Sequence, residues 1–332
     1  MIDDIFVFDN VIHVYDMSDE NTLAGAGHAG RSAMLRQTAP GRHPAAELGV
    51  DRWDKAWATE EMYELVFAQS PTDMAMAQVV PIFEWYRDFF APVAAQYAMA
   101  AAYPDRVLFC GGADPVHQGV EGALDQLEYQ ARELGARSFK FYNGHVSGSW
   151  RCDDEKLAYP LYQKALDLGI DVIQFHKGTP FGTQPLEPLS PLDLEQAAID
   201  FPQMRFIIHH LAAPYFREVV SIAARHPNIH LALSGNLNML FLAPRLVQEQ
   251  MGILLQQVGV HKLLWGSEAA LAGGPAPYLK AFMDLEIPED LRRGYGYPQI
   301  TREDKERILG RNFAEMMGVD IEAKRRELAG AA

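Results

Sequence analysis

The chain has 332 residues, of which 48% are hydrophobic, so it can bury the core of one large domain. Its 29 Lys and Arg residues against 44 Asp and Glu residues give a formal charge of −15, which argues against nucleic acid as a partner because the overall field repels phosphate. No apolar run approaches the roughly 20 residues that cross a bilayer, so no membrane-spanning segment is expected.

Residues 1–4 lack the basic and apolar stretches of a signal peptide. Cys110 and Cys152 are too few for a disulfide framework. We therefore expect a reduced, cytoplasmic location.

Strand-like runs alternate with helical ones along most of the chain. The first strand is expected at 5–13, and residues 16–72 then leave regular patterning. Later strands are expected at 74–82, 106–111, 138–142, 171–176, 205–210, 229–233 and 262–265. Helices are expected at 83–102, 118–134, 155–168, 192–200, 215–225, 246–258 and, at the carboxyl end, 301–332. Eight strands, each followed by a helix or a loop, predict an α/β fold of the TIM (β/α)8 barrel type with a long insertion after the first strand.

We expect a single domain over residues 1–332, because the one plausible linker, 272–277, lies inside the last loop. The insertion 16–72 leaves the first strand on the face where the strand ends open. It is therefore expected to cap the barrel mouth and to supply apolar walls through Trp53, Trp57 or Tyr63. A long segment rich in aromatic residues could instead reach a second subunit, as a homo-oligomer or beside a homologous chain.

Four residues of metal-binding type stand at or just after the carboxyl ends of four expected strands. They are His13, His176, His210 and Glu268. In a (β/α)8 barrel these ends open onto one face, so side chains far apart in sequence can converge on one ion. One histidine at a strand end is usually structural, but four such residues at four ends favour a metal site. Strand alternation also places Asp9, Val11 and His13 on one face.

Six segments resemble, in order, the amidohydrolase superfamily. They are 9–13 (Asp-Asn-Val-Ile-His), 139–142 (Phe-Lys-Phe-Tyr), 172–178 (Val-Ile-Gln-Phe-His-Lys-Gly), 206–211 (Phe-Ile-Ile-His-His-Leu), 265–268 (Trp-Gly-Ser-Glu) and 308–313 (Ile-Leu-Gly-Arg-Asn-Phe). The resemblance spans residues 5–319 apart from about 20–70. It is closest to the branch that holds metal-dependent hydrolases and non-oxidative decarboxylases of small carboxylic acids.

The resemblance implies metal ligands, which are His13, His176, His210 and Glu268, the last in place of the family's aspartate. Val11 replaces the first histidine of the family's Asp-x-His-x-His motif, and Asp9 could substitute as a ligand only if the metal sits lower in the barrel. Lys140 lies where some branches carry a carboxylated lysine between two ions, although a buried ion pair explains a lysine there more simply.

The chemistry of these residues supports the same interpretation. Imidazole binds zinc, iron or manganese, and a bound divalent ion can lower the pKa of water toward about 7. Glu268 would act as general base or orient the water, and His210 could polarise a substrate carbonyl or carry a proton. The expected substrate-binding residues are Lys140 and Lys177, which could pair with a carboxylate, and Tyr142 and Trp265, which could line an apolar mouth.

Other polar residues have simpler explanations. His209 is expected to face the helix layer and to be structural. Asn236 and Asn238 could face the site, but the chemistry of a turn explains them equally well, and Asp114 has the same ambiguity. The histidines expected to face solvent are His117, His145 and His226.

Three hypotheses follow for the function. The first is a divalent-metal enzyme, with zinc, manganese or iron, that hydrolyses or decarboxylates a small carboxylate substrate. The second is an iron or manganese enzyme on the same fold that activates oxygen. The third is a catalytically silent barrel, impaired through Val11, that pairs with an active homologue.

Overall fold

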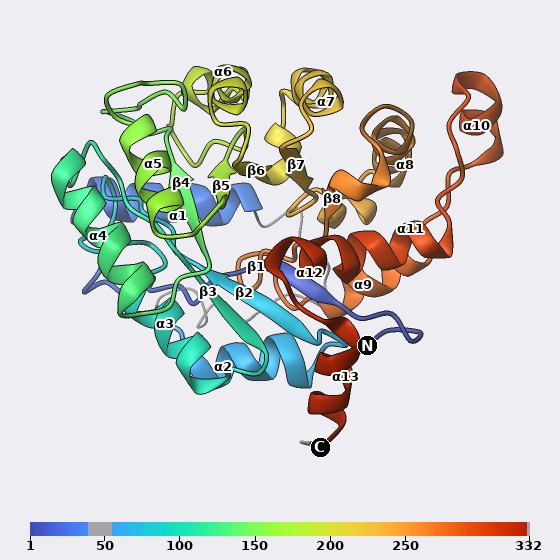
Figure 1. The fold of residues 1–332 in the computed structure, drawn as a ribbon, viewed down its shortest axis with the longest axis horizontal. Coiled ribbons are helices and arrows are strands. Elements are labelled where there is room, and N and C mark those ends of the chain that lie inside the picture. Colours follow the sequence, from blue (N-terminus) through green and yellow to red (C-terminus); the bar gives the residue numbers. More distant parts are fainter. Residues whose placement is uncertain (39–54, 331–332) are drawn as a thin grey trace.

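The structure is a computed structural model that describes residues 1–38 and 55–330, so Trp53 lies outside the described residues. Eight parallel strands pair in the order β1 to β8. They are β1 (Phe8–Ile12), β2 (Met74–Gln78), β3 (Val107–Gly111), β4 (Ser138–Tyr142), β5 (Val172–His176), β6 (Arg205–Ile208), β7 (Ile229–Ala232) and β8 (Leu263–Leu264). Two backbone hydrogen bonds link the ends of the sheet. Asn10 N donates to Trp265 O at 3.1 Å, and His13 N donates to Ala269 O at 2.8 Å. The predicted barrel is confirmed (Figure 1).

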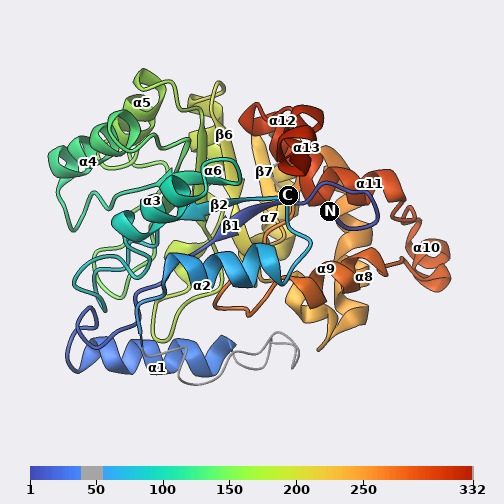
Figure 2. The same cartoon turned by 90° about the horizontal axis from the view of Figure 1, so that it is seen from below.

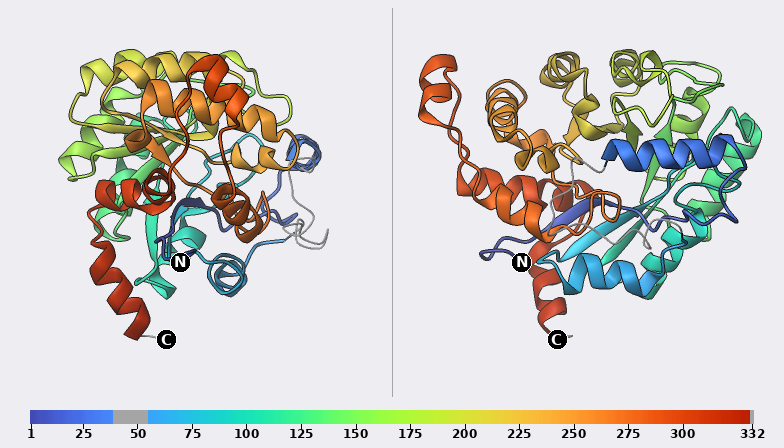
Figure 3. Two further views of the ribbon diagram at one scale, coloured as in Figure 1. Left: turned by 90° about the vertical axis from the view of Figure 1, so that its right-hand side faces the viewer. Right: turned by 180° about the vertical axis from the view of Figure 1, so that it is seen from behind.

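The helix expected at 83–102 begins only at Val93, and the helix at 276–283 is not among the predicted ones. The other helices of the (β/α) repeat lie close to the predicted ranges, and all of the repeat's helices surround the strands. They are α3 (Val93–Ala102), α4 (Val120–Arg132), α5 (Tyr159–Asp167), α6 (Asp193–Asp200), α7 (Phe216–Arg225), α8 (Pro244–Ile253) and α9 (Ala276–Met283). Shorter 3₁₀ and π turns are η4 (Glu64–Ala68), η5 (Glu187–Leu189), η6 (His209–Ala212), η7 (Leu237–Leu240), η8 (Leu254–Val258), η9 (Val260–Lys262) and η10 (Arg307–Arg311). The helix α10 (Glu289–Tyr295) projects beside α8 (Figure 3). No helix of the described residues is long and apolar enough to cross a membrane.

The carboxyl-terminal region is not the single helix that the sequence predicts. It contains α11 (Arg302–Glu306), α12 (Asn312–Met317) and α13 (Ile321–Gly330). Gly318 ends α12 with φ of +69°, a left-handed conformation that glycine adopts without steric cost. Phe313 of α12 packs on Phe8 of β1, with ring centroids 4.7 Å apart, and so closes the amino-terminal end of the barrel.

The strands separate an outer apolar layer from a barrel interior that becomes polar toward the carboxyl ends. Phe141 and Phe175 point outward and pack with Tyr162 of α5. The interior near the amino ends is filled by Met76, Ile207 and their apolar neighbours. Helices α1 and α13 lie at opposite ends of the strands (Figure 2).

The first strand contains a bulge. Asp9 pairs with Ala75, whereas Ile12 pairs with Ala77, so three steps along β1 match two along β2. Ile12, Ala75 and Ala77 share one hydrophobic cluster and therefore one face. The extra residue shifts the alternation by one position and turns His13 to the other face. The prediction that Asp9 and His13 share a face is wrong for this reason.

The insertion after β1 contains α1 (Ala26–Thr38) and α2 (Thr59–Tyr63). Near the end of α1, Gln37 Nε2 donates to Pro180 O at 2.6 Å, which fastens this helix to the loop after β5. Trp57 is buried in the cluster that holds Ile12, and Tyr63 stacks on Tyr103 at 4.3 Å. The insertion therefore reaches the carboxyl end of the barrel through α1.

Candidate metal centre

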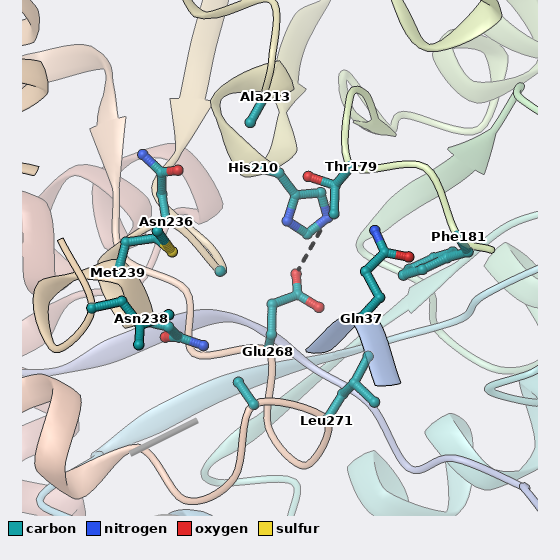
Figure 4. A pocket seen from close by; sticks show the side chains of 13 residues that line it. Gln37, Thr179, Phe181, His210, Ala213, Asn236, Asn238, Met239, Glu268 and Leu271 are labelled. Carbon is teal, nitrogen blue, oxygen red and sulfur yellow. Dashed lines mark ion pairs between the residues drawn. The ribbon is translucent and has the colours of Figure 1, made fainter. Parts of the chain in front are cut away.

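The four predicted ligands lie together at the carboxyl ends of the strands. His13 follows β1, His176 ends β5, His210 lies in η6 after β6, and Glu268 follows β8. His13 Nε2 is 3.4 Å from Glu268 Oε2, and His210 Nε2 is 3.8 Å from Glu268 Oε1 (Figure 4). His176 Nδ1 is 3.0 Å from His210 Nε2. All four side chains are buried, so these contacts are shielded from solvent.

The three imidazoles share one arrangement, in which the second ring nitrogen of each lies against a backbone carbonyl oxygen. The pairs are His13 Nδ1 and Gln78 O at 2.7 Å, His176 Nε2 and Thr179 O at 3.1 Å, and His210 Nδ1 and Ser234 O at 3.0 Å. Because a carbonyl oxygen only accepts, each of these nitrogens must carry the proton of a neutral ring. The remaining nitrogens then present lone pairs, and those of His176 and His210 face each other at 3.0 Å.

This donor set fits a divalent cation. Lone pairs held that close repel one another unless a cation or a proton lies between them. Two ligands bound to one ion through bonds of about 2.0–2.1 Å lie roughly 3 Å apart. A carbonyl oxygen against the far nitrogen is also the usual outer contact of a metal-binding histidine. His13 Nε2 and Glu268 Oε1 have no hydrogen-bond partner among the described residues, so they too are available to an ion.

The electrostatics keep the site in the protonation state that a metal needs. Burial lowers the pKa of His176 well below its usual range, and the neighbouring His210 and Lys140 lower it further. Burial also lowers the pKa of His210. For Glu268, burial alone would raise the pKa, but the neighbouring histidines His210, His13 and His209 outweigh it and hold the pKa well below its usual range. The site therefore offers neutral imidazoles and a carboxylate at neutral pH.

Unusual backbone conformations aim two of these side chains. His210 has φ of +60° and Glu268 has φ of +59°, and Leu211 and Ala212 continue the left-handed run with φ of +48° each. Such conformations cost of order 1–3 kcal/mol for a residue other than glycine and cluster at functional sites. These conformations interrupt the alternation of side chains just after β6 and β8.

His209 is the residue that the sequence interpretation missed. It was expected to face the helix layer, and this is wrong, because its Nδ1 lies 3.8 Å from Glu268 Oε1. Its Nε2 donates to Gln174 Oε1 at 2.8 Å, and Ser234 Oγ lies 3.0 Å from its Nδ1. Gln174 Oε1 also accepts from Gln78 Nε2 at 2.9 Å, which fixes the amide orientation. His209, His210 and Glu268 each place a ligand-type atom within 4.8 Å of the others, although both nitrogens of His209 already have hydrogen-bond partners.

The sequence contains a signal for this supporting layer. Gln78 and Gln174 stand in strands that are otherwise apolar, and both are fully buried. A buried amide needs partners, so two such glutamines indicate a polar layer inside the barrel.

Asp9 lies apart from the four residues because of the bulge. Its Oδ1 accepts from Ser267 N at 2.9 Å and from Val11 N at 3.2 Å. Burial raises its pKa to about 7. Asp9 therefore holds the backbone of Ser267, the residue before Glu268.

Lys140 and Tyr142 point into the same region from β4. Lys140 is fully buried, and its Nζ has no hydrogen-bond partner in the described part of the chain, so the expected ion pair is wrong. Burial lowers the pKa of Lys140 to about 7. The ring of Tyr142 stacks on that of His176, with centroids 4.6 Å apart.

The structure places the other two predicted substrate-binding residues elsewhere. Lys177 follows His176 and points outward, where its Nζ donates to both oxygens of Asp193 at 2.7 and 2.9 Å. Trp265 packs in the helix layer, 6.2 Å from Phe282. Strand parity accounts for Lys177, since neighbours along a strand face opposite sides.

A cavity of about 340 Å³ opens beside His210 and Glu268 (Figure 4). Apolar side chains such as Phe181 and Met239 form much of its wall. Gln37 of α1 also lines it, so the insertion contributes to the site. The described aromatic residues expected to do so, Trp57 and Tyr63, are not among the lining residues.

A second group of titratable side chains lies in the loops after β3 and β4. Asp114 Oδ2 is 2.6 Å from His145 Nε2, and Asp114 Oδ1 is 3.3 Å from His117 Nδ1. His145 Nε2 also lies 3.0 Å from Tyr142 O, so this nitrogen carries a proton and is not a metal ligand. The three side chains, which could together hold a metal ion, link the two loops through close contacts between carboxylate and imidazole. His145 is fully buried, which makes the prediction that it faces solvent wrong.

Comparison with known proteins agrees with the fold. A family model described as amidohydrolase matches residues 49–319. Among solved structures, an uncharacterised TIM-barrel protein from Bordetella bronchiseptica is 20% identical, with 95% of this chain and 99% of that chain covered and a TM-score of 0.69. The 5-carboxyvanillate decarboxylase from Sphingomonas paucimobilis is 13% identical, with 95% and 100% covered and a TM-score of 0.58. A probable 2-pyrone-4,6-dicarboxylic acid hydrolase from Acinetobacter baumannii is 12% identical, with 94% and 99% covered and a TM-score of 0.55. No match was found among curated proteins.

Proposed function

Because the chain belongs to the amidohydrolase family and is therefore an enzyme of hydrolase or decarboxylase type, we propose that it acts on a small carboxylic acid with the help of one divalent metal ion. Zinc, manganese and iron all suit the ligand types present. The reaction is either hydrolysis or decarboxylation without oxidation.

The observation that carries the proposal is the set of hydrogen-bond partners around His13, His176 and His210. One nitrogen of each ring lies 2.7 to 3.1 Å from a backbone carbonyl oxygen, so the single proton of each neutral ring is assigned there. The lone pairs of His176 and His210 then face each other at 3.0 Å, and those of His13 and His210 lie 3.4 and 3.8 Å from the Glu268 carboxylate. A purely structural group of histidines would instead use those protons to bond to one another or to Glu268.

Each group at the site has a separate role in the proposed reaction. A bound divalent ion would supply Lewis acidity toward water or a substrate oxygen. Glu268 Oε1, which has no hydrogen-bond partner among the described residues, can accept a proton from water or hold it for transfer. Lys140, with a pKa that burial lowers to about 7, can present an ammonium group to a substrate carboxylate near neutral pH. Tyr142 holds the ring of His176 in place by stacking.

Metal analysis of two adjacent histidine variants tests the proposal. Metal is removed from the protein with a chelator, zinc, manganese or iron is added back, and unbound ions are removed by desalting before elemental analysis. About one ion per chain is expected in the wild type and in His209→Gln, whose nitrogens are already engaged, and far less in His210→Gln. Equal metal content in the two variants would refute the ligand assignment. A wild-type chain that holds no ion would favour the catalytically silent barrel.

The reaction type needs a second measurement. Loaded wild type is assayed with a panel of small carboxylic acids, esters and lactones for carbon dioxide release and for acid release. Glu268→Gln and chelated wild type are expected to lose activity together. Activity that survives both treatments would contradict a metal-dependent reaction at this site.

A further inference from the structure

Three amide side chains line the cavity beside Glu268, and two of them have hydrogen-bond partners within the protein. Gln37 is bonded on both sides, since its Nε2 donates to Pro180 O at 2.6 Å and its Oε1 accepts from Gly182 N at 3.3 Å. Asn236 Nδ2 donates to Gln250 Oε1 at 3.0 Å. These two amides have their partners within the protein.

Asn238 is different. It lies in η7, the turn that follows β7, and only 9% of its surface is exposed. Its side-chain amide makes no hydrogen bond to any described residue, and Figure 4 shows it directed toward Glu268 across the cavity. A carboxamide has two donor hydrogens and an acceptor oxygen, and a buried one needs partners. Its amide atoms open to the cavity, where water or a bound molecule can be their partner.

The charge of the cavity limits what that occupant can be. Of the described residues that line it, Glu268 carries a negative charge and none is Lys or Arg. Lys177 is engaged with Asp193, and Arg151 is engaged with Asp153 at the surface. Lys140 is fully buried and is not a lining residue, and the metal at Glu268 would serve the reacting end of the substrate. A second carboxylate placed against Asn238 would therefore be desolvated with no lysine or arginine of the cavity wall to pair with it.

We propose that Asn238 is a substrate-binding residue that selects an uncharged hydrogen-bonding group, such as a hydroxyl, a carbonyl or a carboxamide. The rest of that part of the substrate is apolar and packs on Met239, Leu242 and Leu271. The enzyme thus takes a substrate with one acidic or acyl end and a neutral polar substituent, and discriminates against dicarboxylates. This inference rests on the proposed function, because it places the reacting end of the substrate at Glu268 and the metal.

The test uses the metal-loaded full chain and benzohydroxamic acids, whose hydroxamate anchors them on a metal. Unsubstituted benzohydroxamate is compared with its 3- and 4-carboxamide and 3- and 4-carboxylate derivatives by calorimetric titration. At least one carboxamide isomer is expected to bind roughly tenfold more tightly than the unsubstituted probe, as one or two net hydrogen bonds allow. The corresponding carboxylate is expected to bind more weakly than the unsubstituted probe.

Two leucine variants form a matched pair. Asn238→Leu is expected to abolish the preference for the carboxamide while the unsubstituted probe still binds. Asn236→Leu, the same change two residues away at an amide with an internal partner, is expected to keep the preference. Melting temperature of each variant with and without metal shows that the fold and the metal site persist.

The outcomes separate this inference from the proposed function. Binding of the unsubstituted probe with no preference for either carboxamide, or a preference that survives in Asn238→Leu, overturns the role of Asn238 and leaves the metal site standing. Tighter binding of a carboxylate isomer overturns the exclusion of dicarboxylates. Failure of every probe to bind the loaded chain overturns the metal site and this inference with it.

Discussion

Replacing His176 with alanine should separate the stability of the fold from the stability that a metal adds. The ring lies between Tyr142 and Phe181, with centroid distances of 4.6 and 5.0 Å. Removal of a buried ring of this size costs about 3 kcal/mol of unfolding free energy, and loss of the lone-pair contact with His210 offsets part of it. Since domains are stable by about 5–15 kcal/mol, the metal-free variant should remain folded at room temperature.

The metal contribution can be calculated by mass action. At a free metal concentration one hundred times the dissociation constant, the wild type gains about 2.7 kcal/mol. If loss of one of four ligands weakens binding about a hundredfold, the same concentration adds roughly 0.4 kcal/mol to the variant. The metal-dependent part of the stability should thus fall by about 2.3 kcal/mol.

Urea unfolding in chelator and in buffered zinc or manganese measures both quantities. His145→Ala is the control, because it removes another fully buried histidine, one held by Asp114 outside the metal centre. The control should lose stability equally in chelator and in metal. An equal metal-dependent gain for His176→Ala and the wild type would refute the ligand role, and an unfolded variant at room temperature would refute the separation of site from core.

Three further predictions concern the surroundings of the site. Ser234→Ala should weaken metal binding roughly tenfold, measured by competition with a chelator, because its hydroxyl supports the imidazoles beside it; unchanged affinity would remove it from that role. The hydrogen bond to Asp114 raises the pKa of His117, so its stabilising effect is full below the unfolded pKa of about 6.5 and is lost as pH rises through the folded value. His117→Gln should therefore lower the urea midpoint at pH 5.5 and hardly at pH 9, and an equal loss at both values would contradict this. Lys177→Met should cost about 3 kcal/mol by leaving Asp193 buried without its cation, yet keep the metal content, whereas loss of metal would point to a direct role.

The barrel and the position of its site could be predicted from sequence because both depend on repetition. Alternating strands and helices define the topology, and the topology alone brings the ends of parallel strands to one face. The sequence therefore predicts that Glu268 lies near His13, and their side chains are 3.4 Å apart although 255 residues separate them (268 − 13 = 255). That inference needs no knowledge of any individual contact.

The orientation of particular side chains could not be predicted, because single-residue irregularities decide it. The bulge in β1 separates Asp9 from His13. His209 faces inward by alternation from Ile207, and the left-handed conformation of His210 directs that next side chain to the site as well. Both depend on pairing and packing with distant segments, which a local pattern does not record. The partner of Lys177 could not be predicted for the same reason, since its Nζ donates to Asp193, 16 residues further along the chain.

The bulge also bears on how this strand is compared with others. In-frame loss of one codon between Asp9 and Ile12 would remove the extra residue, so two steps along β1 would match two along β2, and Asp9 and His13 would keep the faces that they have now. The number of residues between the aspartate and the histidine could in this way change without moving either side chain. Genes that share this strand therefore need to be aligned by the pairing of β1 with β2, because counting residues from the aspartate would match the wrong codons.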